Sequence, residues 1–476
     1  MIEASFYWHD YETWGVNPQK DFPCQFAGVR TDMELNVIGK PMMIYSQIPN
    51  DYLPTPNACL ITGITPQLSL QKGLTEAEFI KRIHQQFSQP NTCVVGYNSL
   101  RFDDEVTRNT LYRNFYDPYA REWQNGNSRW DIIDLLRACY ALRPEGINWP
   151  TNEDGVVNFK LQNLSAENDI QHEDAHDAMA DVYATIAIAK LAKKAQPKLF
   201  NYLLNLRSKH KVAALVDCDN ITPLVHISAK FSAAQGCCSW IAPICYHPSN
   251  KNAVIVLNLA IDPTPLLYLS SEQIIEKLYR PNNMLAEGEQ RLPIKLVHIN
   301  KCPVLAPAKT LSEENALRLG IDRNSCLENL AKIRANRELK DKLLKVFNES
   351  TEKSDVDPEH ALYSGGFFSD QDKHLIDTVR QANENALTDL SLPFTDPRLT
   401  ALLFRYKARN FPQTLNDNEV EQWQQHRKFR MLDEKSPASI KMHDYMQEIT
   451  DLSQKYGQNP DKLAVLQALY EYARTL

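Results

Sequence analysis

The 476-residue sequence lacks the features that mark a membrane protein or a secreted protein. No apolar run approaches the roughly 18 residues that a membrane-spanning helix needs. The start, Met1-Ile2-Glu3, has no basic segment of the kind that opens a secretory signal peptide. We therefore expect a cytoplasmic protein.

The ten cysteines form no C-x-x-C pair, so the sequence suggests neither a zinc site nor a disulfide framework. We expect most of these side chains to be reduced thiols that are buried in the core. The ten are Cys24, Cys59, Cys93, Cys139, Cys218, Cys237, Cys238, Cys245, Cys302 and Cys326.

Internal repeats, low-complexity tracts and an excess of positive charge are also missing from the sequence. The net charge of −7 argues mildly against a non-specific binder of polyanions. It does not exclude a nucleic-acid enzyme, because such an enzyme can confine its basic residues to one groove. The contents of hydrophobic residues (43%) and charged residues (23%) are typical of a soluble globular protein. The length exceeds one ordinary domain, so two or three domains are expected.

Residues 1–192 alternate strand-like and helix-like segments, which predicts an α/β domain whose sheet is covered by helices. The predicted strands are Ala4–Trp8, Phe26–Arg30, Met42–Tyr45 and Thr92–Tyr97. The predicted helices are Thr75–Phe87 with Thr75 as its N-cap, Arg101–Phe115, Ile132–Leu142 and Ala175–Lys194.

The sequence pattern changes twice after this domain. Residues 196–215 predict a helix that leaves it, and short strand-like runs between turns then predict a small β-rich domain over residues 223–307. From Ser312, which with Asn315 opens a helix, the pattern is helical, apart from an acidic linker or exposed loop at 348–359. We therefore expect domains at 1–192, 193–350 and 351–476. The expected strands of the second are Leu224–Ser228, Trp240–Ile244, Ala253–Leu259 and Ile294–Ile299.

Two carboxylates lie next to the first predicted strand. Asp10 and Glu12 are two residues apart, so on an extended strand their side chains point the same way. Like charges at this spacing repel one another, and a divalent cation with oxygen ligands is the usual remedy. The D-x-E pattern alone is weak, because strands commonly end in acidic residues that face water.

Further candidates occur downstream in the same domain. Asp103 follows a predicted strand at the start of a helix, where it could act only as a helix acid that the macrodipole favours. His176 and Asp181 lie at the start of another helix, and an isolated histidine there is more often a capping or core residue. Their five-residue separation is on the order of 7–8 Å along a helix, which lets Asp181 reach a metal while His176 reaches a water molecule.

Together, the four carboxylates and the histidine match the requirements of phosphodiester hydrolysis. Two metal ions about 3.5–4 Å apart can serve both ends of an in-line displacement. Several carboxylates are needed to hold two such ions, and a neutral histidine outside the metal shell can accept a proton from the attacking water.

The blocks D-x-E, N-x-x-x-F-D and H-x-x-x-x-D, in this order, resemble the DEDDh family of 3′→5′ exonucleases. Longer blocks are similar to the bacterial exonuclease I family, and this resemblance covers essentially the whole chain. These blocks are His9–Thr13, Gly96–Asn109, Arg113–Tyr119, Ala141–Pro150, His298–Leu305 and Gly366–Asp370.

The resemblance implies a ribonuclease-H-like exonuclease domain with a mixed sheet, followed by an SH3-like β domain and an α-helical C-terminal domain. It implies processive release of 5′-mononucleotides from the 3′ end of single-stranded DNA in repair and recombination. Two Mg²⁺ ions per active site are implied, and Mn²⁺ can substitute. By the family's pattern Asp10, Glu12 and Asp181 ligate metal, and Glu12 also contacts substrate. Asp103 completes the acidic set through water, and His176 is the general base.

Substrate contacts are also implied by the resemblance, since single strands are held by basic residues along the phosphates and by aromatic rings that stack on bases. For each aromatic residue the alternative is core packing. Lys160 stands where the family suggests an arginine, so it keeps the charge but loses bidentate phosphate geometry. The matching positions are Arg108, Tyr119, Trp123, Arg137, Lys160, Asn252, Lys295, His298, Tyr363, Phe367 and Gln371.

The resemblance further implies a monomer that is recruited by the acidic, apolar C-terminal tail of single-stranded DNA-binding protein. Such a tail needs an arginine beside an apolar pocket. Thr222 occupies a position where a lysine is expected. The corresponding positions for the tail are Arg143, Tyr202, Leu327 and Arg334.

Two other hypotheses were weighed against a DNA exonuclease. An RNA-trimming exonuclease stays open, because motifs at the metal site do not distinguish the two sugars. A catalytically silent single-strand-binding protein would lack a carboxylate or the histidine, and all five residues are present.

Overall fold

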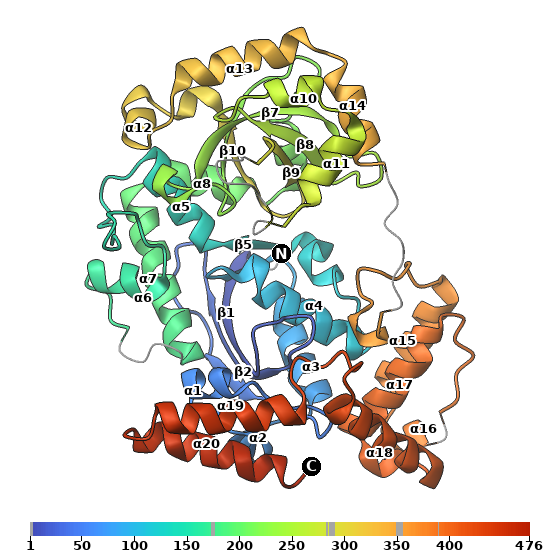
Figure 1. The fold of residues 1–476 in the computed structure, drawn as a ribbon. Coiled ribbons are helices and arrows are strands. Elements are labelled where there is room, and N and C mark those ends of the chain that lie inside the picture. Colours follow the sequence, from blue (N-terminus) through green and yellow to red (C-terminus); the bar gives the residue numbers. More distant parts are fainter. Residues whose placement is uncertain (1–2, 173–176, 282–283, 285–290, 349–355, 389) are drawn as a thin grey trace. The chain divides into compact units, whose positions relative to one another are not determined.

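The computed structural model describes residues 3–172, 177–281, 284, 291–348, 356–388 and 390–476 (Figure 1). They form two compact units. The first unit takes in the described residues of 1–128, 173–183 and 353–476, and the second those of 129–172 and 184–352. Within these ranges, no helix is both long enough and apolar enough to cross a membrane.

A five-stranded mixed sheet carries the first candidate carboxylates, in the order β3-β2-β1-β4-β5. The central strand β1 pairs antiparallel with β2 and parallel with β4. The boundary between the two units runs through β5. The strands are β1 (Ser5–Thr13), β2 (Pro23–Thr31), β3 (Met42–Tyr45), β4 (Thr92–Gly96) and β5 (Ser128–Asp131).

Strand β1 extends beyond Trp8, where the predicted strand ends. Its aromatic residues favour an extended backbone and pack in the core, with Phe6 and Trp8 fully buried. The strand continues because Asp10 and Glu12 remain in register with β2. The two acids therefore project from an ordered strand instead of following its end.

Helices from both ends of the chain complete the first unit. The C-terminal helices α19 and α20 pack on α1 and α2 around a shared apolar core that contains Trp14, Tyr445 and Leu469 (Figure 1). Helix α7 (Ala178–Ala195) begins in this unit and continues in the second. The other helices are α1 (Pro56–Thr62), α2 (Pro66–Lys72), α3 (Glu76–Phe87), α4 (Asp103–Arg113), α15 (Asp370–Gln381), α16 (Glu384–Thr388), α17 (Pro397–Asn410), α18 (Asp417–Leu432), α19 (Met442–Lys455) and α20 (Pro460–Ala473).

The second unit is built on an antiparallel sheet with the order β10-β6-β7-β8-β9. The four predicted strands are confirmed, and the structure adds β10. The strands are β6 (Leu224–Ile227), β7 (Cys238–Tyr246), β8 (Ala253–Asn258), β9 (Ile294–His298) and β10 (Val304–Pro307). The helices are α5 (Ile132–Leu142), α6 (Leu161–Glu167), α8 (Pro197–Asn205), α9 (Lys209–Ala213), α10 (Thr264–Tyr268), α11 (Ser271–Tyr279), α12 (Glu313–Arg318), α13 (Arg323–Ala335) and α14 (Leu339–Val346).

Two segment predictions were wrong. The predicted helix over 196–215 is split into α8 and α9, because Ser208 has an extended backbone (φ −81°, ψ 114°) that interrupts it. The linker or exposed loop predicted at 348–359 is wrong at its end, since Glu359 lies in the 3₁₀ turn Pro358–His360 and is only 5% exposed. Residues 349–355 of this segment lie outside the described residues. Arginines of α17 and α18 neutralise Glu359, which allows an acidic residue to be buried.

The predictions for helix starts and for cysteine burial agree better with the structure. Helix α3 begins after Thr75 as predicted, but the Thr75 side chain forms no capping hydrogen bond. The Ser312 hydroxyl does accept the backbone N–H of Asn315 at the start of α12. Nine of the ten cysteines are buried, which confirms the expectation that most of these side chains lie in the core, and Cys218 is half-buried.

Candidate active site

Three carboxylates converge in the first unit. Asp10 and Glu12 come from β1, and Asp181 comes from the first turn of α7. One ligand oxygen of each lies within 4.8 Å of the others, close enough to share a metal ion. The alternating burial of β1 explains the first pair, because Asp10 and Glu12 are half-buried while Tyr11 between them is buried.

Asp103 is the first residue of α4 and is 4% exposed. Its Oδ1 accepts a hydrogen bond of 3.1 Å from the backbone N–H of Tyr11. One turn further along α4, the Thr107 hydroxyl donates to the Tyr11 hydroxyl at 3.1 Å. Asp103 is therefore a helix-initiating acid, as the simpler hypothesis states, and is also tied to the strand that carries Asp10 and Glu12.

Burial and like charge raise the carboxyl pKa values at this site. Burial is the largest cause for Asp10, whose pKa lies well above its ordinary value, and the carboxylates of Asp103, Glu12, Asp181 and Asp177 add to it. The pKa of Glu12 is raised to about 8, by burial first and then by Asp181, Asp103 and Asp177. So many buried carboxyl groups are stable only with bound protons or a shared cation, and hard divalent cations prefer such oxygen ligands.

Asp177 belongs to this acidic cluster although it is not among the predicted residues. Its Oδ1 accepts the backbone N–H groups of Met179 and Ala180 at 3.0 and 3.1 Å, so it caps α7 and orients the turn that carries Asp181. An aspartate directly before a helical segment is the sequence signal that could have identified it. His176 lies outside the described residues, so its role stays a prediction.

Comparison with known proteins extends these observations to the whole chain. The family model described as Exonuclease matches residues 7–189, that of the Exonuclease I SH3-like domain matches 207–349, and that of the Exonuclease I C-terminal domain matches 356–476. Exodeoxyribonuclease I of Escherichia coli K12 is 50% identical over 474 residues, which cover 100% of this chain and 98% of the relative. The chain belongs to the exonuclease I family.

Solved structures agree with this membership. A zinc-bound complex of E. coli exonuclease I with single-stranded DNA is 50% identical, with a TM-score of 0.94 and coverage of 100% of this chain and 99% of that one. A structure of single-stranded DNA-binding protein and exonuclease I in complex with an inhibitor is 50% identical, with a TM-score of 0.92 and coverage of 100% of both chains. The chain accordingly has an exonuclease domain, then an SH3-like domain, then a C-terminal helical domain.

In this member of the exonuclease I family, the first unit exposes several of the predicted substrate contacts. Trp123 is 66% exposed and Phe367 is 98% exposed, so the alternative of core packing is wrong for both rings. Tyr363 and Gln371 are also exposed, and Tyr119 is half-buried. These side chains are accessible to a bound strand.

Arg108 differs from these exposed residues because it is buried in an ion network. Its guanidinium pairs with Glu105 and Glu122 at 2.7 Å each and lies over the Tyr119 ring. It also donates to the Tyr363 hydroxyl at 3.1 Å. In this conformation Arg108 orients the rings of Tyr119 and Tyr363, while its charge is paired with Glu105 and Glu122.

The second unit carries the remaining predicted substrate contacts. Lys160 is exposed at the start of α6, whereas Arg137 is buried and pairs with Asp134 at 2.7 Å. The Lys295 ammonium donates to Ser228 at 3.0 Å. Asn252 and His298 are half-buried, and burial, followed by Lys301 and His247, lowers the pKa of His298.

The second unit also contains a pocket of about 460 Å³ that two of the four predicted partner contacts line. The Tyr202 hydroxyl is fixed by donation to the Leu305 carbonyl at 3.0 Å, and Arg143 donates to the carbonyls of Leu142 and Thr310. Leu327 and Arg334 lie on α13 and are not part of the pocket lining. The pocket is lined by Leu142, Arg143, Gln196, Pro197, Lys198, Leu199, Tyr202, Pro307 and Thr310.

Proposed function

We propose that this chain is a metal-dependent phosphodiester hydrolase that degrades single-stranded DNA processively from the 3′ end and releases 5′-mononucleotides. The observation that carries this proposal is the convergence of Asp10, Glu12 and Asp181 within 4.8 Å in a chain that belongs to the exonuclease I family. The single-stranded DNA in the complex of the E. coli relative supports DNA as the substrate.

The acidic cluster suits Mg²⁺, with two ions per active site and Mn²⁺ as a substitute. Three carboxylate oxygens within 4.8 Å are a donor set that hard divalent cations prefer, and their mutual repulsion favours cation binding. The zinc in the structure of the E. coli relative supports a divalent cation. When bound, such ions stabilise the charge on the attacking and leaving oxygens of an in-line displacement.

The remaining catalytic roles are assigned to residues of the chain itself. Asp10, Glu12 and Asp181 hold the cations, while Asp103, fixed by the Tyr11 amide, completes the negative charge of the cluster. His176 accepts the proton of the attacking water, because a neutral imidazole suits this transfer near pH 7 to 8. Glu12 also contacts the terminal nucleotide, and Lys160 binds its phosphate.

The rest of the strand is held by bases stacked on aromatic rings and phosphates near cations. The exposed rings of Trp123, Tyr363 and Phe367 support stacking. Arg108 acts through Tyr119 and Tyr363 as well as through its charge. The remaining proposed contacts are Arg137, Asn252, Lys295, His298 and Gln371.

We also propose that the second unit binds the acidic, apolar C-terminal tail of single-stranded DNA-binding protein. Arg143 supplies a cation at the edge of a pocket whose wall includes Leu142, Leu199 and Pro307. A tail with a terminal carboxylate and apolar side chains matches this combination. The similar structure of single-stranded DNA-binding protein and exonuclease I with an inhibitor supports the pairing.

The biological setting proposed for this activity is DNA repair and recombination by a cytoplasmic monomer. The domain limits of 1–192, 193–350 and 351–476 are proposed together with it. The matches of the three family models, at 7–189, 207–349 and 356–476, support a division into three parts.

The deciding experiment is digestion of two matched single strands, one of DNA and one of RNA, each labelled at the 5′ end. Each is incubated with and without Mg²⁺. We expect a descending ladder, or full loss to mononucleotide, on DNA only and in the presence of the metal only, which reports substrate, polarity and cofactor together.

Two other results would change the assignment. Comparable digestion of RNA would favour an RNA-trimming exonuclease on the same catalytic residues. Digestion of neither strand, with binding retained, would favour a single-strand-binding protein.

A further inference from the structure

Residues 359–368, which we call the display loop, present two aromatic side chains to solvent. Phe367 is 98% exposed and Tyr363 is 54% exposed. An exposed ring on a mobile loop binds weakly, because ordering the loop costs conformational entropy. A loop that is already fixed avoids this cost, so the contacts that fix the display loop matter for binding.

One arginine of α17 bridges the two halves of the display loop. Arg398 Nη1 donates to the Ala361 carbonyl at 3.1 Å, and Nη2 donates to the Gly366 carbonyl at 2.7 Å. The Asp396 carboxylate holds the same guanidinium through Nε at 2.9 Å and Nη2 at 2.7 Å. Arg398 thus joins two backbone positions five residues apart on either side of Tyr363.

The two glycines of the loop differ in their surroundings. A Cβ atom on Gly365 would lie 1.6 Å from Nη1 of Arg398 and 2.2 Å from its Cζ, so only glycine allows this close approach. A Cβ atom on Gly366 would meet nothing within 4 Å. Gly365 is therefore needed for the contact with Arg398, and Gly366 provides a matched control.

Packing beneath the loop adds to these hydrogen bonds. The Arg398 guanidinium lies 4.6 Å from the centre of the Phe368 ring. The Phe368 ring is also parallel to that of Tyr112 of α4, with an interplanar angle of 2°. The Tyr363 hydroxyl donates to Glu105 of the same helix. The loop is thus attached to the helix that begins at Asp103.

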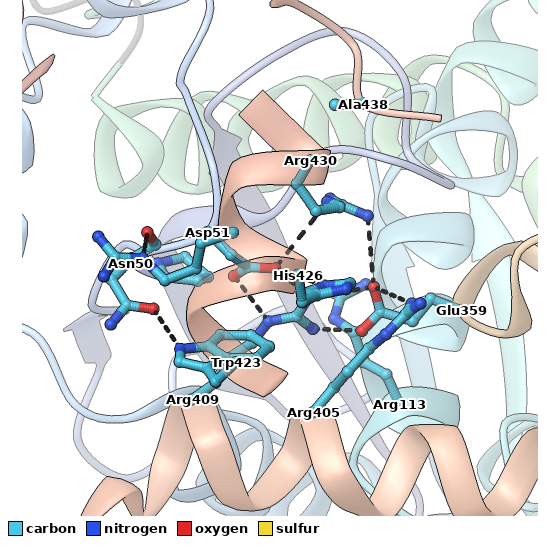
Figure 2. Close-up of polar contacts among 12 residues, drawn as sticks. Asn50, Asp51, Arg113, Glu359, Arg405, Arg409, Trp423, His426, Arg430 and Ala438 are labelled. Carbon is cyan, nitrogen blue, oxygen red and sulfur yellow. Dashed lines mark hydrogen bonds and ion pairs between the residues drawn. The ribbon is translucent and has the colours of Figure 1, made fainter. Parts of the chain in front are cut away.

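The start of the loop is fixed by a buried cluster of charges (Figure 2). The Glu359 carboxylate accepts two hydrogen bonds from Arg409, and it lies 3.1 Å from Arg405 Nη1 and 3.6 Å from Arg430 Nη1. Arg409 also binds Asp51, through Nε at 2.9 Å and Nη2 at 2.7 Å. With Arg398 bridging residues 361 and 366, the loop is held at its start and across its middle.

We infer that Arg398 is a positioning residue for substrate binding, which holds the display loop in the conformation that presents Tyr363 and Phe367 to single-stranded DNA. This role rests on the proposed DNA contacts of those two rings. It predicts that loss of Arg398 weakens binding through Phe367 without touching the chemistry at the carboxylates.

The test compares Arg398→Leu and Gly365→Ala with Gly366→Ala and Arg380→Leu in the full chain. Arg380 is a control for the loss of charge, since it pairs with Asp377 on α15 and lies over the Tyr116 ring. Hydrogen exchange of residues 361–368 should be about tenfold faster or more in the first two variants, because two hydrogen bonds to a charged group are lost. It should be unchanged in the controls.

Binding of a 5′-labelled single strand in EDTA gives the functional readout. Phe367→Ala should raise Kd about 5- to 100-fold, the usual effect of one stacked base, and Arg398→Leu should raise it by a similar factor. In the Phe367→Ala background, Arg398→Leu should raise Kd by a smaller factor than it does alone, because the contact through Phe367 is already lost. With Mg²⁺, KM should rise while kcat stays within about twofold.

Two results would overturn the inference at different points. If Phe367→Ala binds DNA like the wild type, the proposed DNA contact is wrong and Arg398 has no ring to position. If Phe367→Ala weakens binding while Arg398→Leu alters neither exchange nor Kd, or if the two effects add, the contact stands and the positioning role is wrong.

Discussion

The backbone amide of Tyr11 donates a hydrogen bond of 3.1 Å to Oδ1 of Asp103. Tyr11 lies between Asp10 and Glu12 on β1, and Asp103 begins α4. One hydrogen bond therefore fixes the carboxylate of a helix against the strand that supplies two of the converging acids. The two elements are far apart in the sequence, so the sequence does not reveal this hydrogen bond. The hydrogen bond nevertheless determines where the charge of Asp103 lies.

Replacing Asp103 with asparagine separates its charge from its position. Asp103→Asn keeps an oxygen that can accept the Tyr11 amide, so we expect little change in Tm. Turnover on single-stranded DNA should fall about 10- to 100-fold, as is usual when a residue that supports metal ligands is lost. Initial rates on a 5′-labelled strand, with thermal melting as the control, check this. Wild-type turnover would mean that the negative charge of Asp103 is not used.

The spacing of the acids on β1 was enough to predict that Asp10 and Glu12 point the same way, although the D-x-E pattern alone is a weak signal for a site. Period-two alternation places Asp10 and Glu12 on one side of a strand, and the structure confirms this together with the start of α4 at Asp103. The contribution of Asp177 and the donation by Tyr11 depend on how the elements pack. Sequence spacing carries no information on such contacts between distant segments.

The solvent exposure of side chains in loops was the second property that the sequence did not predict. Trp123 and Phe367 have no periodic neighbours that would reveal a buried face, so core packing and solvent exposure were equally open until the structure excluded the former. For Glu359 the error is the reverse, because its acidic segment predicts an exposed linker whereas the side chain is buried. Its burial depends on arginines of α17 and α18, about 50 to 70 residues further along the chain.

Asp181→Ala tests the converging carboxylates directly. It removes one of three ligands within 4.8 Å, so we expect cleavage to be abolished while DNA binding in EDTA is largely kept. The rise in Tm that Mg²⁺ gives the wild type should also shrink, because a ligand that binds the folded state stabilises it. Digestion assays, anisotropy and melting curves measure the three effects. Retention of wild-type turnover would show that the metal site is assigned wrongly.

His176→Ala tests the proposed general base. Turnover should fall by roughly 10²–10⁴-fold, the usual cost of losing a proton acceptor in the transition state. His172→Ala, at a histidine just before the same helix, is the control for a nearby imidazole and should keep wild-type turnover. If His176→Ala changes only thermal stability, the histidine has a structural role.

Arg143→Ala tests the proposed pocket for the acidic tail. A hydrogen-bonded charge pair is worth about 1.5–3 kcal/mol, so Kd for a labelled tail peptide should rise about 10- to 100-fold. Arg207→Ala, at an arginine of the same unit outside the pocket lining, should bind like the wild type. Arg334→Ala extends the test to α13, and unchanged binding by that variant would exclude α13 from the site. Unchanged binding by Arg143→Ala would exclude the pocket itself.

The buried charge cluster of Figure 2 predicts a loss of stability in acid. Burial alone would raise the pKa values of Asp51 and Glu359. The guanidinium of Arg409 outweighs it at both, assisted by His426 and Arg430 at Asp51 and by Arg405 and Arg430 at Glu359, and holds both pKa values well below their usual range. In the unfolded chain these groups titrate at about 3.9 and 4.3. Below these values the unfolded chain binds protons that the folded chain does not bind.

Above about pH 5 these two groups should therefore contribute their full stabilisation, which does not vary with pH there, and the free energy of unfolding should fall as the pH is lowered further. Melting curves between pH 7 and pH 3 measure this dependence. Asp51→Asn should be less stable than the wild type at pH 7, since it leaves Arg409 partly unpaired in the interior. It should also lose less stability between pH 5 and pH 3, because one of the two titrating groups is gone. Parallel curves for the two proteins would mean that Asp51 keeps an ordinary pKa in the folded chain.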